Sequence, residues 1–209
     1  LNENYTWVLQ REKQDDITYY SISFPDQNNG WICGYNGTIK NSIDGGNSWN
    51  SQQSGVSANL WDISFINNQQ GWICGANTIL KTLDGGNSWS NISPSNSENK
   101  IYVTIKFFDE NNGWTSNNQG EILRTTNGGL SWDIRKSGHI GGSRLSVINS
   151  QTVYALSGQL YRTFNSGETW DSLNTSIPKN YFPSEIFFID ANNGWIITEN
   201  GTGDRKSGG

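Results

Sequence analysis

The chain has 209 residues, a net charge of −5 at pH 7 and an isoelectric point near 4.8. This acidic balance argues against a surface for nucleic acid or anionic membranes, and no apolar run approaches the roughly 20 residues of a membrane span. Only 33% of the residues are hydrophobic, but 10 Trp, 8 Tyr, 8 Phe and 24 Gly are present, which favours many short strands packed through large rings and joined by tight turns.

Taken in order, the N-terminal segment contains Tyr5-Thr6-Trp7-Val8-Leu9, which matches the end of a motif that occurs four times further on. That motif is Asp44-Gly45-Gly46-Asn47-Ser48-Trp49, and it returns unchanged at 84–89. The third and fourth copies begin with Asn and read Asn127-Gly128-Gly129-Leu130-Ser131-Trp132 and Asn165-Ser166-Gly167-Glu168-Thr169-Trp170. The spacings from Trp49 to Trp89, Trp132 and Trp170 are 40, 43 and 38 residues in turn. A period of this size is typical of a propeller, a solenoid or an array.

Gly-Gly after an acidic or amide residue is the chemistry of a hairpin turn. Glycine accepts positive φ, Asp or Asn folds back onto the N–H groups of the turn, and the Trp starts the outgoing strand as a large apolar body. Asn in two of the four copies supports a turn lock, since an amide is a poor general base. We therefore predict a structural role for Asp44, Gly46, Trp49, Asp84, Gly86, Trp89, Asn127, Gly129, Trp132, Asn165, Gly167 and Trp170.

A second marker keeps the same period and divides the chain into five units. It is the pair Gly30-Trp31, which recurs at 71–72, 113–114 and 194–195, with Thr152-Val153 in the fourth unit. Each unit opens with an alternating strand: Tyr20–Phe24, Trp61–Phe65, Val103–Phe107, Ser143–Val147 and Ser184–Phe188. The Gly-Trp strand, a third strand running into the motif and the strand after its Trp complete four strands per unit. The predicted units are 18–53, 58–93, 101–136, 143–174 and 183–209 together with 1–10.

The motif resembles the Asp-box, or bacterial neuraminidase repeat, of the form Ser/Thr-x-Asp-x-Gly-x-Ser/Thr-Trp. The longer unit from Gly30 to Trp49 is similar to the photosystem II stability/assembly-factor-like branch. The resemblance implies an all-β fold, a β-propeller of four-stranded antiparallel blades with the box on the rim, away from the ligand site. Read directly, residues 1–209 form one domain of five blades closed by the N-terminal strand. The resemblance also implies an alternative, in which the chain is part of a seven-bladed propeller.

The innermost strands carry unlike side chains at matching positions, and these are the candidate ligand-binding residues. They are Trp61, Asp62, Lys106, Arg144 and Glu185. Asp62 and Glu185 are also weak candidates for the carboxylate pair of a glycosidase. Alternatively, the four charged residues neutralise one another around channel water. Tyr19, Tyr20, Tyr102 and Tyr181 either join Trp61 in an aromatic platform or pack between blades.

The remaining reactive side chains do not indicate a disulfide, a metal site or a sialidase active site. Cys33 and Cys74 occupy equivalent positions of successive units, too far apart for a disulfide, and we predict small buried side chains without a metal. His139 lies in a glycine-rich loop and is expected to be solvated. Arg124, Arg162 and Arg205 fall beside the boxes on the rim, so they are not the arginine cluster of a sialidase.

Fold resemblance does not decide function, since Asp-box propellers include sialidases, xyloglucanases, sorting receptors and assembly factors. We expect a non-enzymatic binding scaffold that recognises a protein, peptide or glycan through its loops and channel mouth. The alternatives are a glycoside hydrolase with channel-facing carboxylates, and a truncated or engineered repeat protein without a ligand of its own. No cofactor is required, and we expect a monomer.

The location of the protein is a further expectation. The chain begins with Leu1 instead of Met and shows no signal peptide, which suggests a mature or trimmed form. The family resemblance and the Asn/Ser/Thr-rich, low-charge composition favour a bacterial protein exported to the periplasm, the cell surface or the medium.

Overall fold

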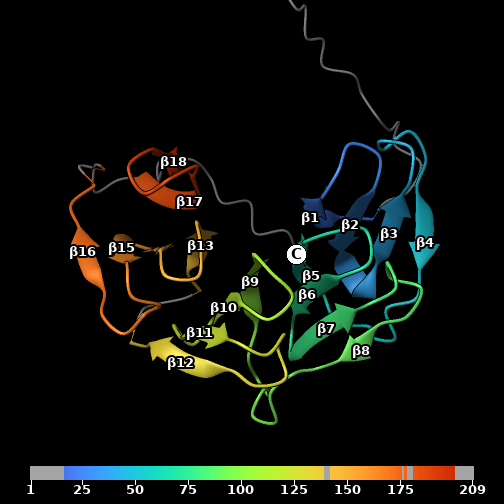
Figure 1. Cartoon of the computed structure of the whole chain (residues 1–209), viewed down its shortest axis with the longest axis horizontal. Helices are drawn as coiled ribbons and strands as arrows, with labels where there is room; N and C mark the ends of the chain where they lie inside the picture. Colours follow the sequence, from blue (N-terminus) through green and yellow to red (C-terminus); the bar gives the residue numbers. More distant parts are fainter. Residues whose placement is uncertain (1–16, 139–141, 176, 178–180, 201–209) are drawn as a thin grey trace, which may run out of the picture.

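The computed structural model describes residues 17–138, 142–175, 177 and 181–200. These residues form five antiparallel sheets and no α-helix, with a single 3-10 turn, η1 (Tyr35–Gly37), in the first sheet. The sheets stand side by side in an arc around a common axis, with the first strand of each sheet innermost (Figure 1). The prediction of an all-β propeller with four-stranded antiparallel blades is confirmed.

Each blade follows the chain from the axis outwards. Blade 1 contains β1 (Tyr19–Ser23), β2 (Gly30–Gly34), β3 (Ile39–Ser42) and β4 (Asn50–Gln52). Blade 2 contains β5 (Leu60–Phe65), β6 (Gly71–Gly75), β7 (Thr78–Thr82) and β8 (Ser90–Asn91). Blade 3 contains β9 (Tyr102–Phe107), β10 (Gly113–Asn117), β11 (Ile122–Thr125) and β12 (Asp133–Lys136). Blade 4 contains β13 (Arg144–Val147), β14 (Val153–Ser157), β15 (Gln159–Thr163) and β16 (Asp171–Leu173).

The fifth sheet has two described strands, β17 (Tyr181–Phe188) and β18 (Gly194–Asn200). Its predicted third strand (202–207) and the N-terminal strand expected to close it (5–9) lie outside the described residues. Closure of the fifth blade by the N-terminus therefore stays a prediction.

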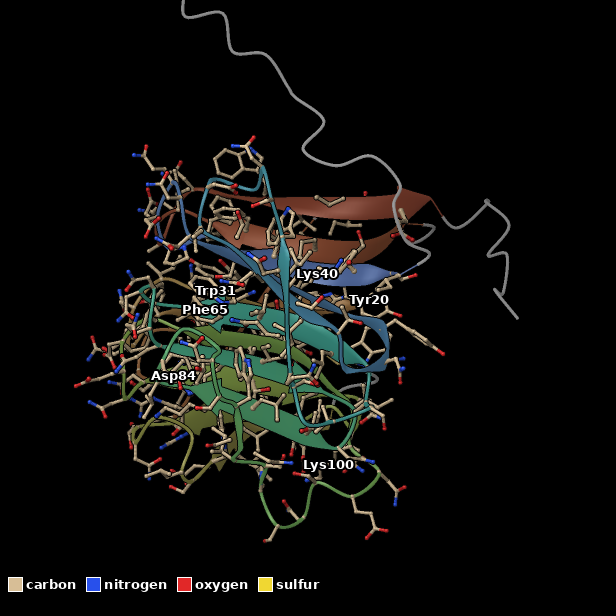
Figure 2. All side chains as sticks on the ribbon, turned by 90° about the vertical axis from the view of Figure 1, so that its right-hand side faces the viewer. Tyr20, Trp31, Lys40, Phe65, Asp84 and Lys100 are labelled. Atoms are coloured by element: carbon tan, nitrogen blue, oxygen red, sulfur yellow. The ribbon has the colours of Figure 1, made fainter. Side chains whose placement is uncertain are left out.

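Neighbouring blades are joined by stacked aromatic rings. Trp31 of blade 1 lies on Phe65 of blade 2 with ring centroids 3.8 Å apart and planes 9° from parallel (Figure 2). The pairs Trp72–Phe107 and Tyr154–Phe188 repeat this contact at 3.7 Å. Between blades 3 and 4, Val147 takes the Phe position, and Trp114 meets Trp170 edge-on at 6.1 Å. Such pairs add about 0.5–1.5 kcal/mol each beyond the burial of their area.

The Asp-box is a turn in which the carboxylate is used locally. Asp44 accepts hydrogen bonds from the Ser42 hydroxyl and from both the backbone N–H and hydroxyl of Ser48. Gly45 and Gly46 adopt φ of 70° and 89°, which a side chain would strain. Hydrogen bonds from Ser88 lower the pKa of the equivalent Asp84 to about 2.

The second and third boxes also hold the blade before them. The carbonyl of Gly85 accepts hydrogen bonds from the indole Nε1 of Trp31 at 3.0 Å and the amide of Gln52 at 2.8 Å. Gly128 does the same for Trp72 and Lys81, both at 3.1 Å. The box is thus a turn within one blade and an acceptor for the neighbouring blade.

The box tryptophans correct one detail of the sequence prediction. Trp49 was expected to start the outgoing strand, but β4 begins one residue later, at Asn50, and the other three boxes behave alike. The indole instead turns inward and meets the Phe24 ring of its own blade edge-on, at 6.0 Å. Because the Trp packs over the turn, it does not pair as part of the fourth strand.

The two ends of the described arc expose apolar side chains. Ile22 of blade 1 is 59% exposed, whereas Ile63 at the same position of blade 2 is 2% exposed. At the other end, Trp195 and Ile197 of β18 are 58% and 61% exposed. The residues that pack against a neighbour at internal junctions are therefore uncovered at the first and last described sheets.

Candidate functional site

The innermost strands of blades 1, 2 and 4 each place a serine toward the next blade. The hydroxyl of Ser23 accepts a hydrogen bond from the backbone N–H of Phe65 at 3.0 Å. Ser64 accepts from Phe107 at 3.0 Å, and Ser146 accepts from Phe188 at 2.9 Å. These three serine ties join blades 1 to 2, 2 to 3 and 4 to 5.

Blade 3 replaces its serine with Lys106, so the junction of blades 3 and 4 lacks a serine tie. The ammonium of Lys106 instead reaches back to Asp62 of blade 2, with Nζ 2.8 Å from Oδ2 and 3.1 Å from Oδ1. Burial alone lowers the pKa of Lys106, but the charge and hydrogen bond of Asp62, together with the charge of Glu185, raise it overall. In blade 3, a cation beside the axis thus replaces the serine contact that blades 1, 2 and 4 make.

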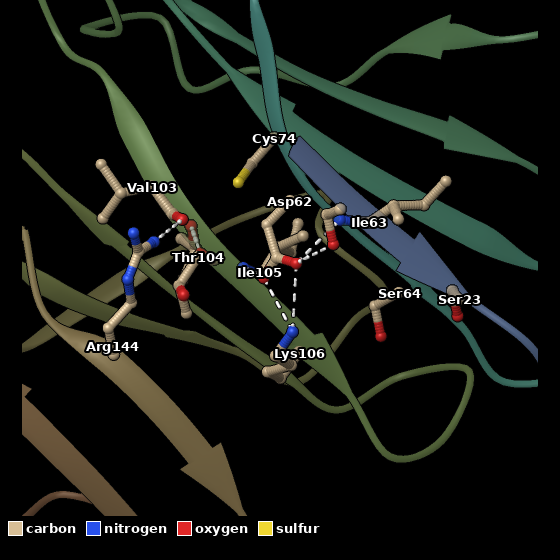
Figure 3. A network of polar contacts seen from close by, with 12 residues as sticks. Ser23, Asp62, Ile63, Ser64, Cys74, Val103, Thr104, Ile105, Lys106 and Arg144 are labelled. Carbon is tan, nitrogen blue, oxygen red and sulfur yellow. Dashed lines mark hydrogen bonds and ion pairs between the residues drawn. The ribbon is translucent and has the colours of Figure 1, made fainter. Parts of the chain in front are cut away.

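Asp62 is saturated with hydrogen bonds and is 6% exposed. Besides Lys106, it accepts from the backbone N–H groups of Ile63 and Ile105 at 3.0 and 2.9 Å (Figure 3). The hydroxyl of Ser21 also donates to it, at 2.7 Å. These donors occupy both of its oxygens. Asp62 is therefore a fixed hydrogen-bond acceptor that links blades 1, 2 and 3.

Arg144 and Glu185 do not join this pair. Arg144 donates from Nη1 to the carbonyl of Val103 at 3.1 Å and from Nε to the carbonyl of Ser184 at 3.2 Å, bridging the strands on either side of its own (Figure 3). Glu185 accepts from its own neighbour, the N–H of Ile186, at 3.0 Å. Neither residue forms an ion pair among the described residues, so the expected mutual neutralisation of all four charges holds only for Asp62 and Lys106.

All five candidate residues line one cavity of about 390 Å³, here called the axis cavity. Its walls come from the five innermost strands, β1, β5, β9, β13 and β17. The lining residues are Tyr20, Ser21, Trp61, Asp62, Thr104, Lys106, Arg144, Glu185, Ile186 and Phe187. Phe187 was not among the residues predicted to lie at the axis. Its position in the innermost strand of blade 5, equivalent to that of Lys106 in blade 3, would have indicated it.

The aromatic platform contains fewer rings than the sequence suggested. Tyr20 and Trp61 pack together at the cavity wall, with ring centroids 4.4 Å apart and a tilt of 31°. Tyr102 is buried between blades, and its hydroxyl lies 3.0 Å from that of Ser97. Tyr19 lies under the ammonium of Lys40, and the side chain of Tyr181 is outside the described part of the chain.

The remaining candidates lie away from the axis cavity. Arg124 lies over the Trp114 ring at 5.9 Å, and Arg162 over Phe164 at 4.5 Å, both beside the boxes; His139 and Arg205 are outside the described residues. Cys33 and Cys74 are free and buried, as predicted, and burial raises the pKa of both thiols.

Neither a metal site nor a membrane-crossing helix is found in the part of the chain that the structure describes. Its Asp, Glu, His and Cys side chains form no cluster of three or more suited to a metal ion. None of its segments is a helix of the length and apolarity needed to span a bilayer.

The repeated box and the fan of four-stranded sheets define a propeller of the bacterial neuraminidase repeat type. The model of the family described as photosynthesis system II assembly factor YCF48 matches residues 2–97 and 47–172. The chain therefore belongs to this family. The comparison with curated proteins found no match.

Solved structures support the same placement. A structure described as YCF48 bound to D1 peptide is 27% identical, with a TM-score of 0.69 over 88% of this chain and 62% of that chain. This chain thus spans about three fifths of the length of that relative. YCF48 from Cyanidioschyzon merolae is 14% identical, with a TM-score of 0.54 over 90% and 95% of the two chains. An ancestral GH74 enzyme is 16% identical, with a TM-score of 0.63 over 81% of this chain and 27% of that enzyme. The last two likenesses concern the fold alone.

Proposed function

We propose that this chain is a non-enzymatic binding protein that recognises an extended segment of a partner protein at the propeller axis. One observation carries the proposal: the axis cavity is built from all five innermost strands, and its side chains differ from blade to blade. The rim, in contrast, repeats nearly the same turn in four blades. Repeat scaffolds conserve the residues that pack and vary the residues that bind.

A peptide suits the chemistry of this cavity. Its volume of about 390 Å³ accommodates a few side chains, and its walls combine an aromatic pair, a guanidinium and a carboxylate. Such a mixture complements a chain that carries apolar and charged groups together. The relative whose structure is described as YCF48 bound to D1 peptide, at 27% identity, adds support for a protein partner.

Hydrolysis of a glycoside is the weaker interpretation of the same residues. A glycosidase needs two carboxyl groups across the scissile bond, one of them able to hold a proton. Asp62 instead uses both of its oxygens to accept from Lys106 and three further donors. The similarity to the ancestral GH74 enzyme, at 16% identity, concerns the propeller fold alone, so we propose binding without catalysis.

The test is peptide capture by the immobilised chain. Two probes are used: the D1 peptide, measured by fluorescence anisotropy, and a synthetic pool of random heptapeptides, identified by mass spectrometry after washing. We expect the chain to retain peptides from at least one probe, and Trp61→Ala to weaken their binding about tenfold or more through the loss of the aromatic wall.

A matched substitution on the rim, Trp49→Phe, controls for general effects and should leave binding unchanged. The proposal is overturned if neither probe is retained. It is also overturned if Trp61→Ala and the rim variant bind captured peptides equally well.

A further inference from the structure

Blade 4 differs from blades 1 and 2 at the mouth of the channel. The loop between the second and third strands has four residues in blade 1 (35–38) and two in blade 2 (76–77), but only Gly158 in blade 4. In the two earlier blades this loop reaches the segment that enters the next blade. Gly37 donates to the carbonyl of Ala58 at 2.8 Å, and Asn77 to that of Lys100 at 2.7 Å.

The short loop of blade 4 borders a cavity. A cavity of about 270 Å³, here called the blade-4 recess, is lined by Val103, Gly142, Arg144, Leu156, Ser157, Gly158 and Ser184. A Cβ atom placed on Gly158 would have no neighbour within 4 Å. Gly158 therefore lines the recess and leaves open space beside it.

Arg144 borders both the axis cavity and the blade-4 recess. It is held in place at its Nε and Nη1 by the carbonyls of Ser184 and Val103, and no carboxylate of the described residues pairs with it. A guanidinium has five N–H donors in a fixed fork, so donors remain after these two bonds. The other cation of the cavity, Lys106, is already neutralised by Asp62.

We propose that Arg144 receives a carboxylate of the bound peptide and that the peptide runs from the axis cavity across Arg144 into the blade-4 recess. This inference rests on the proposed function and names its ligand chemistry. The two cavities meet at Arg144, so a chain that contacts its guanidinium borders both of them. A carboxylate matches the planar guanidinium fork, and the partly buried position strengthens the pairing. The carboxylate belongs either to an Asp or Glu side chain or to the C-terminus of the partner.

The first experiment varies the peptide. Captured heptapeptides are resynthesised in four forms, with a free or amidated C-terminus and with Asp and Glu retained or replaced by Asn and Gln. Anisotropy is then measured with the full chain. We expect at least one carboxylate to contribute about tenfold or more in affinity. A loss on amidation identifies the C-terminus as its source, and a loss on side-chain replacement identifies Asp or Glu.

The second experiment varies the chain. Arg144→Gln should weaken binding of the carboxylate form about tenfold or more and leave the neutral form unchanged. Arg144→Lys keeps the charge without the guanidinium fork, and its affinity for the carboxylate form should lie between those of wild type and Arg144→Gln. Arg162→Gln, the same substitution on the rim of the same blade, should have no effect. Thermal denaturation checks that each variant is folded.

The third experiment fills the recess. Replacing Gly158 by Ala-Asn, the loop of blade 2, should weaken the binding of heptapeptides. The binding of tripeptides that contact only the axis cavity should not change. The inference is overturned if neutral amidated peptides bind wild type as tightly as the original forms, or if Arg144→Gln does not distinguish them. The proposed function survives that outcome, because peptides still bind; it fails only when no peptide is retained.

Discussion

The rim and the axis of this propeller follow opposite rules. On the rim, the same turn recurs four times, and where Asp becomes Asn the amide keeps the contact: Asn127 donates to the hydroxyl of Ser131 at 2.8 Å, where Asp44 accepts from Ser48. At the axis, equivalent positions carry Ser21, Asp62, Thr104, Arg144 and Glu185. Uniformity on the rim fixes the geometry of each blade. Variation at the axis then changes chemistry without changing the scaffold.

Removing a ring from an internal junction should have the largest effect on stability. Trp72 is fully buried, stacks on Phe107 and donates to the carbonyl of Gly128. Trp72→Ala should lower the free energy of unfolding by about 3–5 kcal/mol, as measured by urea denaturation. Trp195→Ala, at the exposed end of the arc, is the matched control and should cost less than about 1 kcal/mol. Equal losses would contradict the idea that stacking between blades stabilises the described arc.

The axis pair should show a smaller effect that depends on both partners. Lys106→Met leaves Asp62 unpaired in a nearly buried position and should cost about 1–3 kcal/mol, less than a fully buried pair because the Lys106 side chain is 39% exposed. The double variant Asp62→Ser with Lys106→Met removes both charges and should recover part of this loss; with the single variants Asp62→Ser and Lys106→Met and the wild type it completes a double-mutant cycle. The coupling energy from the four proteins of this cycle is the measurement, and additive losses would argue against direct pairing.

The smallest effect is expected on the rim, and it depends on pH. The folded-state pKa of Asp84, about 2, lies below its ordinary value of 3.8, so its stabilising contribution is present above about pH 4 and is lost as the pH falls through about 2. Asp84→Asn should cost less than about 1 kcal/mol at pH 7 because an amide also locks this turn in boxes 3 and 4. The difference in Tm between wild type and variant should vanish near pH 2. A difference independent of pH would show that the carboxylate charge is not responsible.

The sequence predicted the blades well because their determinants are local. Gly-Gly after Asp44 requires a particular turn, and Gly-Trp at a constant spacing indicates the second strand of each sheet. The predicted inner strand Trp61–Phe65 differs from β5 by one residue at its start. The position of the box Trp relative to the fourth strand was not predictable, since it depends on packing against Phe24 in space.

The candidate site was predicted as a set of residues but not as a network. Five residues expected at the axis line one cavity, yet the sequence did not show that Lys106 pairs with Asp62 or that Arg144 bonds to two carbonyls. Those partners are set by the offset between adjacent sheets, which no local pattern encodes. The blade-4 recess follows from a loop length, and comparing loop lengths between units would have indicated it.

The serine ties and stacked rings connect each described blade only to its immediate neighbours, so the described blades behave as a linear series of coupled units. Blade 2 has such contacts on both sides, whereas the described part of blade 1 has them on one. Backbone amides of β5 and β6 should therefore exchange with deuterium more slowly than those of β1 and β2. Loss of structure would then begin at an end of the arc and move inward, which sets the order in which a protease gains access to the chain.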